Sequence, residues 1–397
     1  QERDWNRYLE DVARANKLIC NIDLVTDNSL TTAERAQYKA EAKIFRAMVM
    51  FDMVRLWGDF PVITTVADDI TSENIDEVYP QYFPKQNTEL EAYQQIEKDL
   101  LDAVLYAPDN TPGNKTLFSK SVARTLLAKI YAEKPLRDYT KVIQYCDEVK
   151  ADGFDLVDDF SDLFGMNAAG TDAKMRNTKE SILEAQFTSG AGNWCTWMFG
   201  RDLVNWNNNF TWAKWVTPSR DLISAFKQEG DEVRFKESIV YYDCNWSNYY
   251  PSDNYPFMYK CRSANSSIIK YRYADVLLLK AEALIMQDTP DLEGAADIID
   301  EVRDRAKLGA LPTSVRSNKN VLLNALLKER RLELAFEGQR WFDLVRLDKV
   351  EEVMNAVYSK DSGRKAQIYT FDKNSYRLPI PQSVIDANDK IHQNPGY

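Results

Sequence analysis

Histidine is almost missing from the sequence. The single histidine, His392, lies close to the C-terminal end, in "HQNPGY". Zinc sites of the HExxH kind, iron sites with two histidines and one carboxylate, and most catalytic triads need a histidine inside the fold. The chain also lacks a P-loop, a G-x-G-x-x-G fingerprint and a G-x-S-x-G elbow. Together these absences remove a large part of metal-dependent, nucleotide-dependent and triad-based enzyme chemistry.

Cysteines are few and widely spaced, with no C-x-x-C pair. A zinc framework and a disulfide-dense scaffold both need closer, regular spacing. Cys244 and Cys261 could pair, but the odd total leaves at least one thiol free unless another chain takes part. We interpret most of them as small core residues. The five are Cys20, Cys146, Cys195, Cys244 and Cys261.

Long apolar runs and an excess of basic residues are also absent. Runs such as "VLLLKAEALIM" are interrupted by charge and are too short to cross a bilayer. The chain has 50 Lys and Arg against 61 Asp and Glu, a formal net charge of −11, which argues against nucleic-acid binding. The first residues, "QERDWNRYLEDVARANKLIC", have no signal-peptide pattern. We expect a mature or truncated soluble body.

The dominant pattern is helical. In residues 273–286, apolar side chains recur at positions i, i+3, i+4 and i+7, which indicates one buried helix face. Similar patterns predict further helices at about 4–22, 34–57, 88–106, 118–133, 138–150, 293–307 and 320–337.

Two of the expected helical hairpins resemble each other. The stretch "AKIYAEKPLRDYTKVIQYCDEV" (128–149) aligns without a gap on "AEALIMQDTPDLEGAADIIDEV" (281–302), with Asp138 on Asp291 and Cys146 on Ile299. Paired helices with small and large apolar residues at fixed offsets are typical of tetratricopeptide repeats. The sequence therefore predicts a mainly α fold on a tetratricopeptide-like helical-repeat scaffold, a kind of frame that often docks a protein partner.

Residues 151–270 interrupt this pattern with a loop-rich, aromatic-rich insertion. Flat rings beside amide groups suit sugars, and they also serve peptide binding. The alternative is that about half of the rings, Trp215 in particular, are core or loop anchors. The insertion lies where binding groups tend to occur on a rigid frame. The candidate ligand-binding residues are Trp194, Trp197, Trp206, Trp212, Trp246, Tyr249 and Tyr250.

Acidic residues leave two further possibilities open. A glycoside hydrolase that works with two carboxylates needs no histidine, but no spacing among the acids marks out such a pair. The loop "DLVDDFSDLFG", with Asp158, Asp159 and Asp162, lacks the EF-hand pattern. We expect no catalytic residue, metal site or cofactor, and structural calcium in this loop is only a weak possibility.

The stretch "ERRLELAFEGQRWFDLVRL" (329–347) concentrates charge. Glu329, Glu333 and Glu337 are spaced to lie along one helix face, with Arg330 and Arg340 three residues from Glu333 and Glu337. Gly338 is costly inside a helix and indicates a break. Since acids and bases can be paired throughout, we interpret the stretch as a network that fixes helix packing, in preference to an active site.

The same stretch resembles the most characteristic segment of the SusD/RagB family. Other segments agree with the family in order along nearly the whole chain. They are "EAKIFRAMVMFDMVRLWGDFPVI" (41–63), "TPSRDLISAF" with "DEVRF" (217–235), "RYADVLLLKAEAL" (272–284) and "LPIPQSVIDANDKIHQNPGY" (378–397).

The resemblance implies a function that the residues alone do not. Family members are outward-facing lipoproteins of the Bacteroidetes outer membrane, whose repeats pack against a SusC-like TonB-dependent transporter. They capture glycans, or in some members peptides, and deliver them without catalysis. The expected function is therefore glycan capture and delivery. An oligopeptide-binding member, a carboxylate glycoside hydrolase and a docking protein without a small ligand are the alternatives.

The resemblance also sets the expected organisation. We expect one SusD-like domain over 1–397, with a helical frame at about 1–150 and 271–350, the ligand-face insertion at about 151–270 and a C-terminal segment at 351–397. The family's lipoprotein signal, lipidated cysteine and further N-terminal segment find no match here. Cys20 is not the anchor, because Ile19 precedes it where a small residue is needed. Membrane attachment would therefore depend on a part outside this chain.

Overall fold

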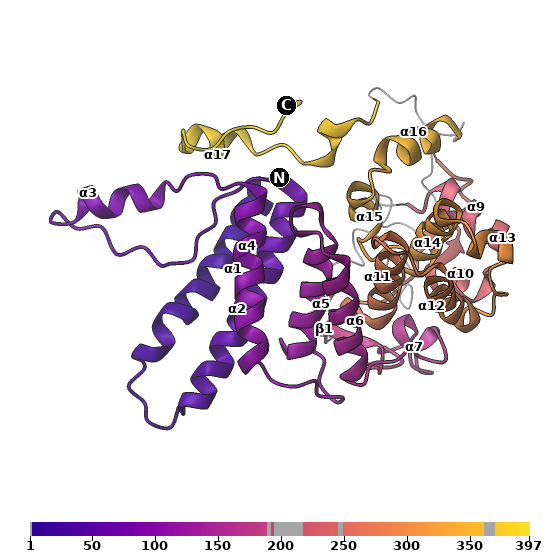
Figure 1. Ribbon diagram of the computed structural model, residues 1–397, viewed down its shortest axis with the longest axis horizontal. Helices are drawn as coiled ribbons and strands as arrows, with labels where there is room; N and C mark the ends of the chain where they lie inside the picture. The colour runs from indigo at the N-terminus through magenta and orange to yellow at the C-terminus, as the bar shows by residue number, and fades with distance from the viewer. Residues whose placement is uncertain (1, 189–191, 194–216, 245–248, 361–369) are drawn as a thin grey trace. The chain divides into compact units, whose positions relative to one another are not determined.

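The computed structural model describes residues 2–188, 192–193, 217–244, 249–360 and 370–397. They form two compact units. Unit 1 comprises residues 1–110, 117–145 and 371–397, and unit 2 comprises residues 111–116 and 146–370. Across the described residues the chain is mainly helical with four short strands, which confirms the predicted fold class (Figure 1). The single-domain organisation remains a prediction.

Unit 1 is built on long helices. Helix α2 packs against both α1 and α4, and α4 packs against α5. Within α2, one turn after another buries apolar side chains such as Ile44, Met50 and Phe51, as expected for a central helix. The helices are α1 Glu2–Asn21, α2 Thr32–Trp57, α3 Ile75–Val78, α4 Glu89–Tyr106, α5 Lys120–Ala132, α6 Tyr139–Ala151, which continues into unit 2, and α17 Gln382–Ala387. Short 3-10 turns, η1 Ile22–Leu24, η2 Tyr79–Tyr82, η3 Lys134–Leu136 and η6 Lys373–Tyr376, lie between them.

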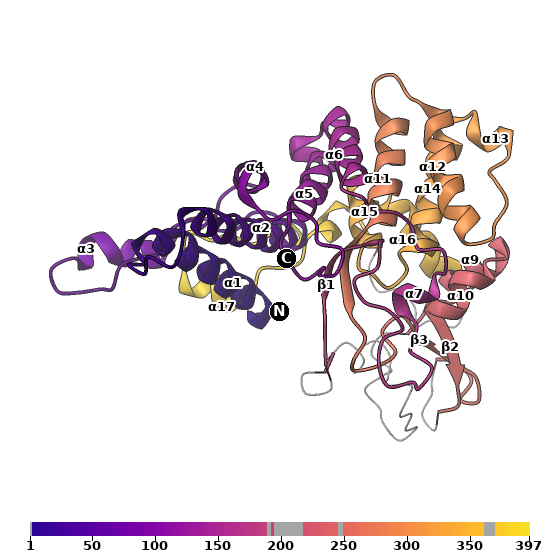
Figure 2. The ribbon, with the colours of Figure 1, turned by 90° about the horizontal axis from the view of Figure 1, so that it is seen from below.

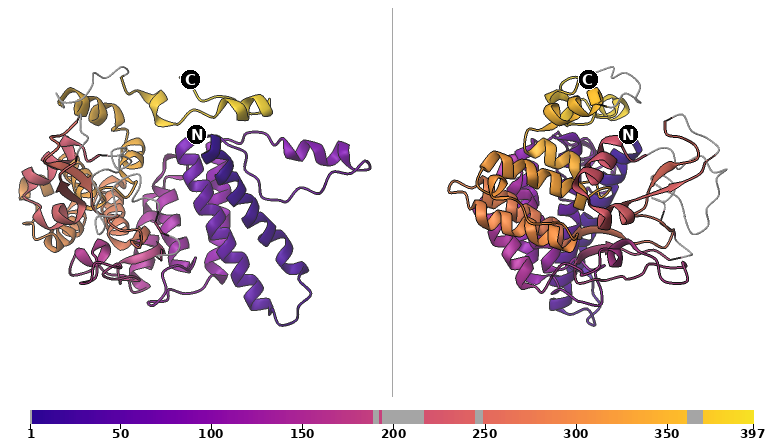
Figure 3. Two further views of the ribbon diagram at one scale, coloured as in Figure 1. Left: turned by 180° about the vertical axis from the view of Figure 1, so that it is seen from behind. Right: turned by 90° about the vertical axis from the view of Figure 1, so that its right-hand side faces the viewer.

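Local sequence explains where the two central helices begin. Thr31 and Glu34 form a reciprocal capping box at the start of α2, and Thr88 and Glu91 form another at the start of α4. Each box satisfies backbone N–H groups that have no partner within the helix. Between the two helices, an arm of residues 61–86 carries α3, and the Phe60–Asn87 backbone pair closes its base (Figure 3).

Unit 2 combines a second helical group with two antiparallel ribbons. Helices α11 Tyr273–Met286, α12 Leu292–Arg305 and α14 Lys319–Glu333 lie side by side (Figure 2). Strand β1 Ser181–Ala185 pairs with β4 Ile268–Arg272, and β2 Ile239–Tyr242 pairs with β3 Tyr255–Met258. The remaining helices are α7 Ser161–Phe164, α9 Arg220–Glu229, α10 Glu232–Ser238, α13 Thr313–Arg316, α15 Arg340–Arg346 and α16 Val350–Lys360.

The aligned hairpins share their local geometry. Asp138 accepts a hydrogen bond from the Lys141 N–H, and Asp291 accepts one from the Gly294 N–H, three residues on in both cases. The backbone N–H of each aspartate also donates to the carbonyl seven residues earlier, and the distance is 2.9 Å in both hairpins. The aligned residues Cys146 and Ile299 are both buried. The prediction of helical repeats is therefore confirmed down to the aspartate that starts each second helix.

We expect the two capping aspartates to contribute equally. Asp138→Ala and Asp291→Ala should each lower the free energy of unfolding by about 1 kcal/mol, because each removes a partner of the helix's first N–H groups. Urea titration followed by circular dichroism measures both losses. Asp288, exposed in the connection that precedes α12, provides the control, and Asp288→Ala should leave the midpoint unchanged. A change as small as that control at Asp138 or Asp291 would contradict a capping role.

The insertion is more regular than its sequence indicates. Residues 151–270 contain α9, α10, strands β1 to β3 and the start of β4, so the expectation that the helical pattern fades in this segment is wrong for 220–238. The apolar side of α9 packs Leu222, Ile223 and Phe226 against Ile239 and Leu332. This packing fixes which face of α9 is exposed.

Candidate functional site

The charged stretch 329–347 supplies the centre of a buried ion network, named here the Glu333 cluster. One oxygen of Glu333 accepts from Arg272 and from Arg305, both at 2.5 Å, and the other accepts from Arg234 at 3.0 Å. Glu180 accepts from Arg272 at 2.6 Å and from Arg305 at 2.9 Å. All five side chains are at most 4% exposed. The cluster ties α10, α12 and α14 to the start of β1 and the end of β4.

A second buried group, the Arg330 cluster, lies at the junction of α11, α14 and α15. Arg330 makes a two-pronged contact with Asp343 at 2.8 and 2.9 Å, and it donates to Asp275 at 2.7 Å. Arg346 makes a similar contact with Glu282 and also reaches Asp343. Such paired geometry is the strongest that guanidinium and carboxylate groups form.

The pKa shifts show that Glu333 and Asp343 stay charged. Burial alone raises the pKa of Glu333, but the charges of Arg305, Arg272 and Arg234 outweigh burial and hold the pKa well below its usual range. Burial likewise raises the pKa of Asp343, and Arg330 and Arg346 lower it by more. A carboxylate that is enclosed and always ionised has neither access to substrate nor a proton to exchange. The interpretation of this stretch as a packing network therefore agrees with the structure.

Three details of the predicted pairing are wrong. Helix α14 ends at Glu333, so Glu337 lies past the helix and reaches Arg272 and Lys260 from the following turn. Arg330 pairs with Asp275 and Asp343, and not with Glu333. Arg340 donates to the Leu327 carbonyl. The break at Gly338, which has φ of +75°, is as predicted.

Most of the predicted ligand-binding rings lie outside the described residues. These are Trp194, Trp197, Trp206, Trp212 and Trp246, and Trp215, which the sequence analysis interpreted as a core or loop anchor, also lies outside the described residues. Tyr249 and Tyr250 are described, and both are half-buried beside β3 in unit 2. Only these two can be placed, and their role in binding stays a prediction.

Tyr249 and Tyr250 form a compact aromatic group with Arg220 of α9. The two rings meet edge to face with centroids 4.9 Å apart. The guanidinium carbon of Arg220 lies 4.2 Å from the Tyr249 centroid and 4.5 Å from that of Tyr250, within the range of cation–π contacts. The Tyr250 hydroxyl donates to the Pro218 carbonyl at 2.8 Å. These contacts hold the rings in place at the first turn of α9.

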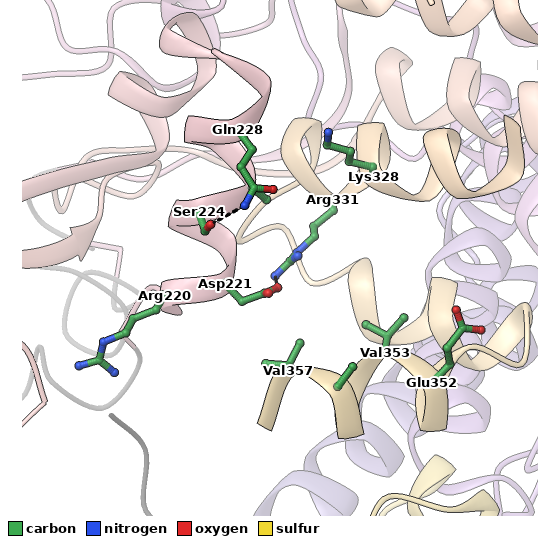
Figure 4. A pocket seen from close by; sticks show the side chains of 11 residues that line it. Arg220, Asp221, Ser224, Gln228, Lys328, Arg331, Glu352, Val353 and Val357 are labelled. Atoms are coloured by element: carbon green, nitrogen blue, oxygen red, sulfur yellow. Dashed lines mark hydrogen bonds and ion pairs between the residues drawn. The ribbon is translucent and has the colours of Figure 1, made fainter. Parts of the chain in front are cut away.

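Two hollows flank this group. The smaller, of about 500 Å³, is lined by Tyr241, Tyr250, Pro251 and Asn254 on the ribbon side and, from α9, by Arg220, Ile223, Ser224, Lys227 and Gln228. The larger, of about 810 Å³, lies between α9, α14 and α16 (Figure 4). Sequence reasoning missed α9 as a binding element, although the apolar spacing of "RDLISAF" could have indicated a helix with one exposed side.

The acidic loop is neutralised from within the chain. Lys174 contacts Asp159 at 2.9 Å and Asp162 at 2.7 Å, and Lys179 contacts Asp155 and Asp158. The described ranges contain no group of three or more His, Cys, Asp and Glu residues that could hold a metal ion. Calcium binding at this loop would have to displace the lysines.

Two further findings bear on the sequence analysis. Cys244 and Cys261 are buried, and no disulfide joins them, so the suggested pairing is not formed. In the part of the chain that the structure describes, no helix is both long enough and apolar enough to cross a membrane.

The fold is therefore that of a helical-repeat protein, and the candidate ligand face is formed by α9 and the Tyr249–Tyr250 group. The chain belongs to the SusD/RagB family. The family model described as "SusD family" matches residues 255–397, and the one described as "Starch-binding associating with outer membrane" matches residues 1–132.

Individual relatives agree over almost the whole chain. The SusD-like protein P2 of Formosa agariphila is 28% identical over 442 aligned residues, which cover 99% of this chain and 80% of that protein. The starch-binding protein SusD of Bacteroides thetaiotaomicron is 24% identical over an alignment that covers 95% of this chain and 76% of that protein.

Solved structures show the same fold. A laminarin-binding SusD-like protein superposes with a TM-score of 0.75 at 23% identity, covering 100% of this chain and 86% of that one. Surface glycan-binding protein A from Bacteroides uniformis gives a TM-score of 0.79 at 19% identity, with 99% and 85% covered. At these identities the likeness establishes the fold alone.

Proposed function

We propose that this chain is a cell-surface glycan-binding protein of the outer membrane that captures oligo- or polysaccharide and delivers it to a SusC-like TonB-dependent transporter. The names of its relatives support carbohydrate binding: one is a starch-binding protein, and two of the similar folds bind laminarin or surface glycans. The description of the matching N-terminal family model supports an outer-membrane location. We propose that a lipid anchor attaches the protein to this membrane.

The observation that carries the proposal is the group of Tyr249, Tyr250 and Arg220 between two hollows. Aromatic rings bind the apolar face of a pyranose, and neighbouring amide and hydroxyl groups bind its rim. Ser224, Gln228 and Asn254 supply such groups within the same lining. The face therefore has both of the elements that sugar binding requires.

A binding role is also favoured over catalysis. Hydrolysis by two carboxylates needs an acid of raised pKa that substrate can reach. Burial raises the pKa of Glu329 and of Asp231, but both acids contact Arg234 in the interior. Neither can reach a glycosidic bond. Burial also raises the pKa of Glu301, but this acid lines a pocket of only about 40 Å³, which is too small for a sugar ring. The family's non-catalytic function therefore fits these residues better.

Titration of intrinsic tryptophan fluorescence with soluble glycans and peptides tests the proposal. The panel contains laminarin, amylopectin, an alginate and a mixed oligopeptide pool. We expect saturable quenching or a spectral shift with at least one neutral glycan and no released reducing sugar on prolonged incubation. A response to peptides alone would favour the oligopeptide-binding alternative, and release of sugar would favour a glycoside hydrolase. Binding of a TonB-dependent transporter without any response to ligands would favour the docking alternative.

A further inference from the structure

Helix α9 carries a row of three polar side chains at intervals of four residues. Arg220, Ser224 and Gln228 all line both the 500 Å³ hollow and the 810 Å³ hollow. Their opposite face is fixed, because Leu222 and Phe226 are buried against the neighbouring core. At a rise of about 1.5 Å per residue, the three side chains are spaced by roughly 6 Å along the helix. We name this row the α9 track.

The side chains of the track can bind hydroxyl groups. The Gln228 amide nitrogen donates to the Ser224 hydroxyl at 3.0 Å, and the hydroxyl keeps its own hydrogen for a further acceptor. The Gln228 amide oxygen is directed away from Ser224 (Figure 4). Gln228 is exposed and Ser224 is half-buried, so both are accessible along the row.

Four of the five charged side chains that line the larger hollow form ion pairs, and the fifth, Arg220, lies over the rings of Tyr249 and Tyr250. Arg331 contacts Asp221 at 2.6 Å across the hollow, Lys328 contacts Glu229, and Glu352 contacts Lys349 at 2.6 Å. An acidic ligand would have to compete with these carboxylates for the cations. Apart from Ser224 and Gln228 of the track, the uncharged part of the lining is small and apolar: Ala225, Val353, Ala356 and Val357.

We propose that the α9 track is a binding subsite for an uncharged, extended oligosaccharide, which lies along the row with one hollow on each side. The proposal rests on the function proposed above and adds to it the class of ligand. Successive side chains of the track are separated by about the length of one sugar unit, so each turn of α9 meets a new pyranose. A chain of several units binds along the track, whereas a disaccharide covers only part of it.

Chain-length dependence measured by calorimetry tests the track. For the wild-type protein, we expect affinity to rise from a disaccharide to a hexasaccharide of the glycan identified in the panel. Ser224→Trp places a bulky ring between the hollows and should remove most of that rise, a loss of about tenfold or more for the hexasaccharide. The matched control is Lys236→Trp, which adds the same ring at an exposed position of α10 and should bind like the wild type.

A second variant keeps the test valid if the tryptophan disturbs folding. The double substitution of Ser224 and Gln228 by alanine removes hydrogen-bonding groups without adding bulk, and we expect a loss of about threefold to tenfold for the hexasaccharide. An unchanged hexasaccharide affinity in both variants would overturn the track while leaving glycan binding intact. If no glycan binds to the wild-type protein, the proposed function itself fails.

Charge provides a separate arm of the test. We expect an acidic polymer, such as alginate, to bind more weakly than the neutral glycan of similar length, with little dependence on salt. Tighter binding of the acidic polymer that weakens steeply with salt would overturn the assignment to uncharged ligands.

Discussion

Replacing Glu333 by alanine is expected to lower the free energy of unfolding of unit 2 by about 3–5 kcal/mol. Arg234, Arg272 and Arg305 all donate to this one carboxylate, and each is at most 4% exposed. Glu180 would then be the one acid left in the cluster, beside three buried arginines. Removing one partner from a buried ion network leaves charge without compensation, which costs far more than the network contributes as a whole.

An exposed acid that also contacts an arginine provides the comparison. Glu293 contacts Arg316 at 2.5 Å, but the glutamate side chain is 72% exposed. Water replaces such a partner, so Glu293→Ala should cost about 1 kcal/mol or less. Urea unfolding of both variants measures the contrast. If Glu293→Ala and Glu333→Ala lower the free energy of unfolding equally, burial does not determine how much Glu333 contributes to stability.

Helices and their repeat could be predicted from the sequence because those signals are local. The start of α12 and the apolar face of α11 each follow from a few neighbouring residues. The ribbons could not be predicted in this way. Strand β1 pairs with β4 across more than 80 residues of sequence, and such pairing depends on contacts that a single short segment does not indicate.

Charge pairing shows the same limit. Spacing along 329–347 correctly predicts a packing network, but it assigns partners from within the stretch. Asp343 does pair within the stretch, with Arg330 and Arg346. Other partners come from elsewhere: Asp275 for Arg330, and Arg234 and Arg272 for Glu333. The candidate ligand face is similar, because Arg220 and Tyr249 meet through tertiary packing. Aromatic density indicated the segment, whereas α9 emerged only from the structure.

Lys260 lies beside the Glu333 cluster and donates both to a backbone carbonyl and to a carboxylate. We expect this buried lysine to make the protein more stable as pH rises above about 8. Its ammonium group donates to the Glu333 carbonyl at 2.9 Å and to Glu337 at 2.6 Å, beside the ring of Phe164. Burial, together with the charge of Arg272, lowers the pKa of Lys260 to about 8, although Glu337 and Glu333 act against this shift. The unfolded chain has the ordinary pKa of 10.5.

The sign of the effect follows from proton binding. Between about pH 8 and about pH 10.5 the unfolded chain keeps a proton that the folded chain has released, so the contribution of Lys260 to stability rises with pH. Below about pH 8 both states are protonated, and the charged lysine is destabilising by a constant amount. The slope approaches about 1.4 kcal/mol per pH unit within the window.

Lys260→Met isolates this contribution, since both acceptors keep a donor. Arg272 still donates to the Glu333 carbonyl at 2.7 Å and to Glu337 at 2.7 and 2.8 Å. We expect the variant to be more stable than the wild type at neutral pH and to lose that advantage as pH rises from about 8 to about 10. Urea unfolding of both proteins across this range gives the difference, in which other titrating groups cancel. A constant difference would mean that Glu337 keeps Lys260 charged throughout, and a variant that is less stable at neutral pH would mean that the ion pair outweighs the cost of burying the ammonium group.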